Sequence, residues 1–402
     1  MSKSVLYLCP SFPYPADNGG KAVFINHINF LKNNGFSIHS VFLDVDNYAQ
    51  NIKSVDIESK GFESIDVFSR KIPRIKNIAS IIKSIYYFIF DAKPRAFIAR
   101  YNPELQEFVR LKITNFKYDY IIFDHFTALS FIDDFEILKC YNSIYIAHNF
   151  EAKVIADQSR NIANPVYKLI YYIEYLKTKQ IEKQILDKIF KTITISSTDK
   201  NELSKFYGSF KIENISEIIP LKSQLWSFVH SKTILFVGGT DYYPNYEAVD
   251  WIVKVLMPAL NKIDNKVTCM IVGNSENYKY KHLSPNVFFP GRIDDNELEK
   301  LYCSSNIFIS PVILGSGIKV KVLTALSYGI PILCTKESLN GIDYLTELNN
   351  IIFERKYLEK SIGDILDLLN DEDKQLKLSS LIKEIIKEHL NTVNNQWSLN
   401  EG

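Results

Sequence analysis

The sequence lacks three features that would define its class at once: a long apolar run, a Cys-x-x-Cys pair and a large net charge. No stretch of eighteen apolar residues occurs, so we expect no membrane-spanning helix. The apolar residues 5–9 are followed at once by Pro10, and they are too few for the core of a signal peptide. We therefore predict a buried first strand at this position and a cytoplasmic protein.

Cysteine is scarce, with five residues in 402 and no Cys-x-x-Cys pair. Four of the five lie in or beside apolar runs, where cysteine acts as a small hydrophobic residue. We therefore predict reduced core cysteines, with no disulfide and no metal site. Lysine and arginine number 47 against 46 acidic residues, so no overall charge attracts nucleic acid and we expect no nucleic-acid partner.

Three sequence motifs are also missing. Neither opening strand is followed by G-x-G-x-x-G, which argues against a nicotinamide or flavin enzyme. The chain has no G-x-x-x-x-G-K-[ST] loop of a nucleotide hydrolase and no G-x-S-x-G nucleophile turn.

Short β-branched and aromatic runs alternate with longer amphipathic segments, which is typical of α/β domains with parallel sheets. Residues 5–9 lead into a glycine-containing loop and a helix at 22–33, and the same order restarts at 233–237 with a helix at about 246–260. Because 402 residues exceed one ordinary core, we predict two Rossmann-like domains facing a central cleft. The predicted strands cover residues 5–9, 38–43, 120–123, 143–147, 192–195, 233–237, 268–272, 287–289, 307–310 and 330–334.

The domain boundaries follow from a break in this pattern. Residues 213–231 lack a clean period and contain Pro220, so we place a linker near residues 220–231. The predicted domains are residues 1–222 and 231–380, with a C-terminal helix and tail at 381–402.

Open parallel sheets bind ligands beyond the carboxyl ends of their strands, so the loops after strands are where a site is expected. Gly19 and Gly20 follow the first strand and precede a helix, where backbone N–H groups can hold an anion. A turn that needs a positive φ explains the same two glycines, and this alternative stays open.

Two histidines also follow predicted strands. His125 comes after residues 120–123, and His148 comes after residues 143–147. Either imidazole could transfer a proton or only hydrogen-bond to a bound hydroxyl or phosphate. We take both as candidate catalytic residues, with a structural hydrogen-bonding role as the alternative.

The richest loop is Gly315-Ser316-Gly317-Ile318-Lys319, which follows a predicted strand and begins a helix. Its small residues admit a phosphate-bearing ligand, and backbone donors at the helix start can hold the phosphate oxygens. A lysine in the first turn of a helix is electrostatically unfavourable, which favours a bound anion. We predict a diphosphate site in which Lys319 neutralises charge on a departing nucleotide; a plain loop with solvated Lys319 is the alternative.

Motifs spread over most of the chain resemble the retaining glycosyltransferases of family 4, also called group 1 glycosyltransferases, which have the GT-B fold. Each motif is short, but their order and spacing together are specific. The last of them matches a branch of the family with a Gly-Ser-Gly-x-Lys loop. The motifs are Gly19-Gly20, His148-Asn149, Val237-Gly238-Gly239, Pro290-Gly291-Arg292-Ile293, and Gly315-Ser316-Gly317-Ile318-Lys319 running to Tyr328-Gly329-Ile330-Pro331.

The resemblance implies transfer of a sugar from a nucleotide-diphosphate sugar to an acceptor hydroxyl, with retention and with no obligatory metal or cofactor. It implies an N-terminal acceptor domain and a C-terminal donor domain, in the synthesis of surface polysaccharide or glycoconjugate on a sugar or lipid-linked sugar. The implied catalytic residues are His125, His148 and Lys319. The implied donor-binding residues are Gly19, Gly20, Gly238, Gly239, Arg292, Ile293, Gly315, Ser316, Gly317, Ile318 and Thr324.

The chain departs from the family pattern in two places. Two glutamates are replaced by Ser316 and Thr324, and a threonine hydroxyl is a weaker acceptor for a ribose diol than a carboxylate. An arginine and a lysine after the first C-terminal strand are replaced by Gly239 and Asn245. These changes keep open a second hypothesis, a catalytically weak GT-B subunit that binds a nucleotide sugar or supports a partner glycosyltransferase.

Residues 71–100 combine seven lysines and arginines with many isoleucines and aromatic residues. A basic amphipathic segment of this kind can lie on the anionic inner face of a membrane, which would make the protein peripheral. A helix packed on the first sheet with solvated lysines is the alternative.

Overall fold

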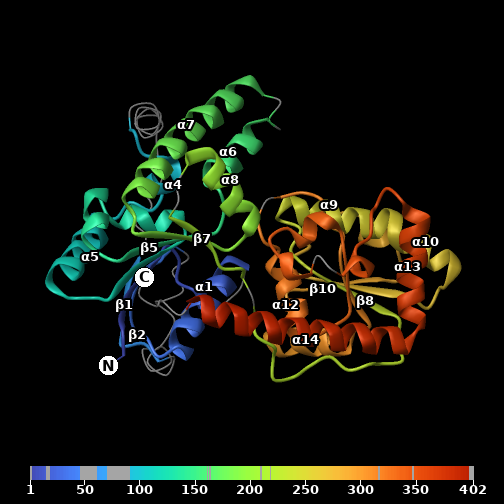
Figure 1. Ribbon diagram of the computed structural model, residues 1–402. Helices are drawn as coiled ribbons and strands as arrows, with labels where there is room; N and C mark the ends of the chain where they lie inside the picture. The colour runs from blue at the N-terminus through green and yellow to red at the C-terminus, as the bar shows by residue number, and fades with distance from the viewer. Residues whose placement is uncertain are drawn as a thin grey trace. The chain divides into compact units, whose positions relative to one another are not determined.

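The computed structural model describes residues 2–14, 19–45, 61–69, 91–160, 162, 164–208, 211–217, 219–315, 317–345 and 348–397. Contacts divide the chain into two compact units, Met1–Ile215 and Ser216–Gly402. Each unit contains one parallel sheet flanked by helices (Figure 1), which confirms the predicted α/β class and the two Rossmann-like domains. Within the described residues, no helix is both long and apolar enough to cross a membrane.

The sheet of the first unit has seven strands in the order β3-β2-β1-β4-β5-β6-β7. All neighbouring strands are parallel, and β1, which lies between β2 and β4, is almost wholly buried, as expected of a parallel strand covered on both faces. The strands are β1 (Ser4–Cys9), β2 (Ser37–Asp44), β3 (Ser64–Ser69), β4 (Tyr120–Asp124), β5 (Ser143–Ala147), β6 (Lys191–Thr194) and β7 (Ile212–Asn214).

Three helices of the first unit, α5, α7 and α8, begin at a side-chain cap. The side chain of Asn102 accepts from the N–H of Leu105, and Pro103 fills the first position of α5, where a missing N–H costs nothing. The α-helices are α1 (Gly19–Asn33), α4 (Arg95–Ile98), α5 (Pro103–Asn115), α6 (Glu151–Arg160), α7 (Pro165–Lys188) and α8 (Ser197–Tyr207), with 3-10 turns η2 (Phe126–Phe131) and η3 (Phe135–Cys140).

The second unit has a five-stranded parallel sheet in the order β10-β9-β8-β11-β12. Its strands are β8 (Thr233–Val237), β9 (Thr268–Val272), β10 (Val287–Gly291), β11 (Ile307–Ser310) and β12 (Ile332–Cys334). Its α-helices are α9 (Tyr243–Trp251), α10 (Met257–Ile263), α11 (Asp295–Ser304), α12 (Val320–Tyr328), α13 (Leu358–Asn370) and α14 (Glu372–Trp397), with 3-10 turns η5 (Lys281–Leu283), η6 (Lys336–Leu339), η7 (Asp343–Leu345) and η8 (Asn349–Ile351).

The helix predicted at about 246–260 is longer than expected and is interrupted. A π-helical turn, η4 (Ile252–Leu256), separates α9 from α10. Pro258 follows in the first turn of α10 and has no N–H to donate, so the regular ladder cannot pass through it.

Two strands escaped prediction, and both lie at edges of the first sheet. β3 has the sequence SIDVFS and no fully buried residue, and β7 has three residues. The start of α1 also differs, because Gly19 and Gly20 form its first turn and do not precede it in a loop.

The segment predicted as a linker packs on the second unit. The Trp226 indole is buried, and its Nε1 donates to the carbonyl of Ser305 at 2.7 Å. The backbone N–H of Lys222 donates to Ser327 at 2.9 Å. The division between units lies at Ile215 and Ser216, and α14 runs through the predicted boundary at residue 380 without a break.

Candidate functional site

A buried carboxylate organises the carboxyl ends of the central strands in the first unit. Asp124 ends β4 and is fully buried. His27 on α1 donates from Nδ1 to one carboxylate oxygen at 2.6 Å, and His148 after β5 donates from Nε2 to the other at 2.6 Å. The hydroxyl of Tyr7 on β1 also donates to Asp124. Four elements thus meet on a single side chain.

This carboxylate is ionised at all ordinary pH values. Burial alone would raise the pKa of Asp124, but His27 and His148 hold it well below its usual range. Burial and the charge of Asp124 raise the pKa of the Tyr7 phenol, so Tyr7 remains a hydrogen-bond donor.

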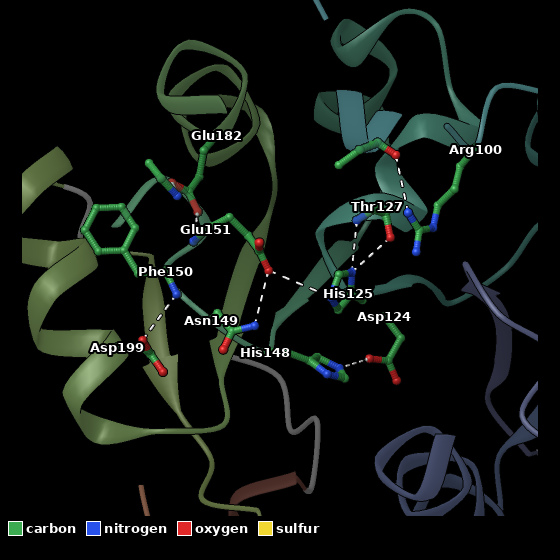
Figure 2. A network of polar contacts seen from close by, with 12 residues as sticks. Arg100, Asp124, His125, Thr127, His148, Asn149, Phe150, Glu151, Glu182 and Asp199 are labelled. Atoms are coloured by element: carbon green, nitrogen blue, oxygen red, sulfur yellow. Dashed lines mark hydrogen bonds and ion pairs between the residues drawn. The ribbon is translucent and has the colours of Figure 1, made fainter. Parts of the chain in front are cut away.

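His125 adopts a strained backbone conformation beside this network. Its φ is 82° and its ψ is 147°, a combination that residues other than glycine rarely adopt. The ring Nδ1 accepts from the backbone N–H of Thr127 at 3.2 Å, so Nε2 carries the proton (Figure 2). Nε2 lies 3.8 Å from a carboxylate oxygen of Glu151. The ring therefore presents an N–H donor.

The electrostatics of His125 favour hydrogen bonding over proton transfer. Burial, with the nearby His148 and Arg100, lowers its pKa to about 3. A neutral imidazole at pH 7 can donate a hydrogen bond but is a poor general base. His125 and His148 lie together, with ring centroids 5.1 Å apart, and Phe24 of α1 packs 5.3 Å from His148.

The same network contains residue types that can bind a metal ion. Within the described part of the chain, His27, Asp124 and His148 offer ligand atoms that all lie within 4.8 Å of one another. Nδ1 of His27 and Nε2 of His148 must each carry a proton to donate to Asp124, whereas a nitrogen that binds a metal is unprotonated. The contacts are therefore those of a hydrogen-bond network, and metal independence stays a prediction.

In the second unit, two glycine-containing loops come close together. Gly238 and Gly239 follow β8, and Gly273 follows β9 with φ 132°. A Cβ on Gly273 would lie 2.7 Å from the carbonyl carbon of Gly238, so no larger residue fits. Asn245 in α9 fixes the first loop by donating to the carbonyl of Gly239 at 2.9 Å.

Lys319 closes its own loop in this structure. It is the N-cap of α12 and is 7% exposed, and its Nζ donates to the carbonyls of Gly315 at 2.9 Å and Gly317 at 2.8 Å. Both glycines have positive φ. Ser316 lies outside the described residues, and Ile318 is partly buried between Gly317 and Lys319.

Lys321 was not among the site residues predicted from the sequence. Its Nζ donates to the amide oxygen of Asn245 and lies 4.7 Å from the Phe236 ring centroid. A Cβ on Gly238 would lie 2.9 Å from Nζ of Lys321, so the lysine fits here because residue 238 is glycine. Burial, and then the charge of Lys319, lower the pKa of Lys321 to about 7. A lysine therefore stands beside the loop after β8, supplied by α12.

The remaining predicted site residues lie at or near the surface, or bond within their own helix. Arg292 is exposed just beyond β10, and Ile293 is partly buried. Gly19 and Gly20 are exposed on the first turn of α1. The hydroxyl of Thr324 donates to the carbonyl of Val320 at 2.9 Å within α12.

Arg355 was not predicted either. It forms a two-pronged ion pair with Glu247 of α9, at 2.7 and 2.6 Å, and donates to the carbonyl of Pro311 at 3.2 Å. This pair ties the chain after β11 to α9 and so supports the glycine and lysine loops.

Comparisons with known proteins bear on both units. Residues 231–371 match the family described as glycosyl transferases group 1. Over nearly the full length of both chains, the structure is similar to TarM, with a TM-score of 0.69 at 11% identity and coverage of 99% and 98%. It is also similar to sucrose-phosphate synthase from Thermosynechococcus elongatus, with a TM-score of 0.68 at 15% identity and coverage of 98% and 97%. The chain has the GT-B fold.

Two curated relatives have sequences similar to this GT-B chain. An uncharacterized 44.6 kDa protein in the cps region of Klebsiella pneumoniae is 24% identical over 341 residues, which cover 80% of each chain. An uncharacterized glycosyltransferase of Methanocaldococcus jannaschii is 21% identical over 235 residues, which cover 54% of this chain and 59% of the relative.

Proposed function

We propose that the chain is a glycosyltransferase of the Gly-Ser-Gly-x-Lys branch of family 4, which moves a sugar from a nucleotide-diphosphate sugar to an acceptor hydroxyl with retention. The observation that carries the proposal is the pair of lysines, Lys319 and Lys321, beside the loops after β8 and β11. Their ammonium groups donate to the uncharged oxygens of Gly315, Gly317 and Asn245. Ammonium groups form their strongest hydrogen bonds with anionic oxygens, and a diphosphate carries several such oxygens.

The first unit would hold the acceptor and the transferred sugar. The Nε2–H group of His125 would donate a hydrogen bond to a sugar hydroxyl, and Asp124 would hold His148 in place. Because the pKa of His125 is lowered to about 3, it would not take the acceptor's proton near pH 7. The leaving phosphate would take that proton, and no metal or cofactor would be needed.

Relatives support the setting and the donor class. The 44.6 kDa relative is a protein in the cps region of Klebsiella pneumoniae, which favours surface polysaccharide or glycoconjugate synthesis. A structurally similar Anabaena protein, HepE, is in complex with UDP and glucose. We propose a cytoplasmic enzyme that acts on a sugar or lipid-linked sugar and contacts the membrane through residues 71–100, of which residues 71–90 lie outside the described part of the chain.

Calorimetric titration with UDP-, GDP- and dTDP-sugars tests the proposal, followed by assays of transfer and hydrolysis with and without EDTA. We expect one base to be preferred, turnover that EDTA leaves unchanged, and loss of transfer in Lys319→Ala without loss of folding. Failure of every nucleotide sugar to bind would rule the donor site out.

Lys321→Met isolates the second lysine. A charge-assisted hydrogen bond contributes about 1.5–3 kcal/mol, so donor affinity should fall about tenfold or more. The diphosphate of a sugar nucleotide keeps its charge between pH 6 and pH 8.5, whereas Lys321 loses its proton near its pKa of about 7. Wild-type affinity should therefore fall over this range and that of Lys321→Met should not. Lys300→Met, on an exposed face of α11, is the matched control.

The second hypothesis, a catalytically weak subunit, is favoured by one contact. The Thr324 hydroxyl donates a hydrogen bond to the carbonyl of Val320 within α12. Thr324 stands where the family pattern has a carboxylate that would bind a ribose diol. Donor binding without transfer or hydrolysis, at any acceptor tested, would support this hypothesis over the first.

A further inference from the structure

The first half of α7 carries an apolar face that is exposed. Val166, Leu169, Tyr172 and Leu176 recur at spacings of three and four, so they lie on one side of the helix. Their exposed fractions are 64%, 59%, 52% and 45%, and the adjacent Tyr167 is 59% exposed. No residue from 165 to 173 is fully buried, whereas α7 buries residues regularly from Glu174 onward.

This face belongs to a helical hairpin. The backbone N–H of Glu151, at the start of α6, donates to Glu182 near the end of α7 at 3.0 Å, so the two helices run in opposite directions. Figure 1 shows α6 and α7 side by side, extending away from the sheet of the first unit. The free end of the hairpin therefore holds the start of α7.

On residues 165–183 of α7, the acids are buried and the lysines are not; the exposed Asp187 comes after this stretch. Residues 165–183 contain two acids, Glu174 and Glu182, which are 3% and 0% exposed. Both point inward, where Glu174 accepts from the backbone N–H of Arg95 at 2.9 Å and Glu182 accepts from Glu151. The same stretch contains four lysines, which all lie at the surface or partly exposed: Lys168, Lys177, Lys179 and Lys183.

A neighbouring element extends this cationic character. The Arg95 guanidinium of α4 lies over the Tyr171 ring of α7, 5.3 Å from its centroid, and its side chain is 50% exposed. Arg95 is thus a fifth basic residue at the edge of the apolar face, and its Nε also lies 3.5 Å from a carboxylate oxygen of Glu174.

We propose that this surface, the side of α7 from Val166 to Leu176 with its bordering lysines, docks on an anionic lipid bilayer. Aliphatic side chains enter the acyl boundary, tyrosines suit the headgroup level, and lysines bind lipid phosphates. A second copy of the chain fits less well, because residues 165–183 expose four lysines and no acid, so self-pairing would bring together surfaces of like charge. This lipid contact is independent of the donor site in the second unit.

Flotation of the full-length chain with vesicles tests the proposal. The wild type should float with vesicles of phosphatidylcholine mixed with phosphatidylglycerol and remain behind with phosphatidylcholine alone. The double variant Leu169→Glu with Tyr172→Glu should float much less than the wild type, because only the contact proposed for residues 71–100 would remain. The double variant Lys168→Gln with Lys183→Gln should bind more weakly, by about fivefold for each lysine removed near the surface.

Controls separate lipid binding from folding and from the donor site. Leu376→Glu, at a similarly exposed position on α14, should float like the wild type. All variants should keep the wild-type melting temperature and bind the donor nucleotide in solution as before. A wild type that never floats would overturn the proposal, and so would a Leu169→Glu with Tyr172→Glu variant that floats normally. A dimer in sedimentation that Leu169→Glu disrupts would assign the surface to a second copy instead.

Discussion

His125 combines an unfavourable backbone conformation with a ring that the site would use. A φ of 82° with a ψ of 147° costs a residue with a Cβ about 1–3 kcal/mol. Such strain persists only where surrounding contacts hold it, here the bond from Thr127 and the packing against His148. The strained position is therefore consistent with a functional role for the ring.

Glycine at this position should relieve the strain. Glycine normally makes a chain less stable than alanine does, but at this φ we expect His125→Gly to exceed His125→Ala by about 1 kcal/mol in free energy of unfolding. Urea unfolding of the two variants measures the difference. Both should lose most sugar transfer, because neither has the ring. If the alanine variant is the more stable, the backbone relaxes on mutation and the strain is not intrinsic to the position.

Single residues of the site could be predicted where their role is local. The sequence placed His125 and His148 after their strands and Lys319 at the start of a helix, and the structure agrees. It did not reveal that His27 reaches Asp124 across 97 positions or that Lys321 reaches Asn245 across 76. These contacts depend on how α1 and α12 pack, which no local pattern encodes.

At the scale of elements, Glu182 links α6 and α7 through a buried carboxyl. It accepts from the N–H groups of Glu151 at 3.0 Å and Ala152 at 3.4 Å, and from the Tyr207 hydroxyl at 2.9 Å. These bonds satisfy N–H groups in the first turn of α6 that have no partner within the helix. Burial raises the pKa of Glu182 to about 8, so the folded chain keeps this proton at neutral pH.

The raised pKa fixes the sign of a pH effect. An unfolded glutamate loses its proton near pH 4.3, so between about pH 4 and 8 the folded state binds the extra proton and stability falls as pH rises. Glu182→Gln keeps the acceptor and removes the titration. The variant should therefore gain stability relative to the wild type from pH 5 to pH 8, by at most about 1.4 kcal/mol per pH unit.

Urea unfolding at both pH values measures this change. The exposed Glu63→Gln is the control, for which the difference from wild type should stay constant. A constant difference for Glu182→Gln as well would contradict the buried, protonated carboxyl.

At the scale of the molecule, the alternation of strands and helices was enough to predict two parallel α/β units. Strand order and strand number were not predictable in the same way. β3 and β7 are the edge strands, and each pairs with one neighbour only. Their apolar pattern is weak, so their sequences resemble loops. The buried Trp226 shows the same limit, since an apparently irregular segment is fixed by contacts with distant residues.

Donor binding should protect the two units unequally. The glycine and lysine loops after β8 and β11 all belong to the unit Ser216–Gly402, whereas the histidines belong to Met1–Ile215. A nucleotide at a hundred times its Kd stabilises the state it binds by about 2.7 kcal/mol, so amides that exchange through opening of the second unit should slow about a hundredfold. Hydrogen exchange on the full chain measures this at each peptide.

We expect the slowing around residues 238–247 and 317–324, with little change in β1, β4 and β5. Lys321→Met at the same nucleotide concentration should show less slowing, because its lower affinity leaves fewer molecules bound. A nucleoside without phosphates should have almost no effect, since the proposed contacts are to the diphosphate. Slowing centred on Asp124 and His148 would instead place the nucleotide on the first unit and reverse the assignment of donor and acceptor.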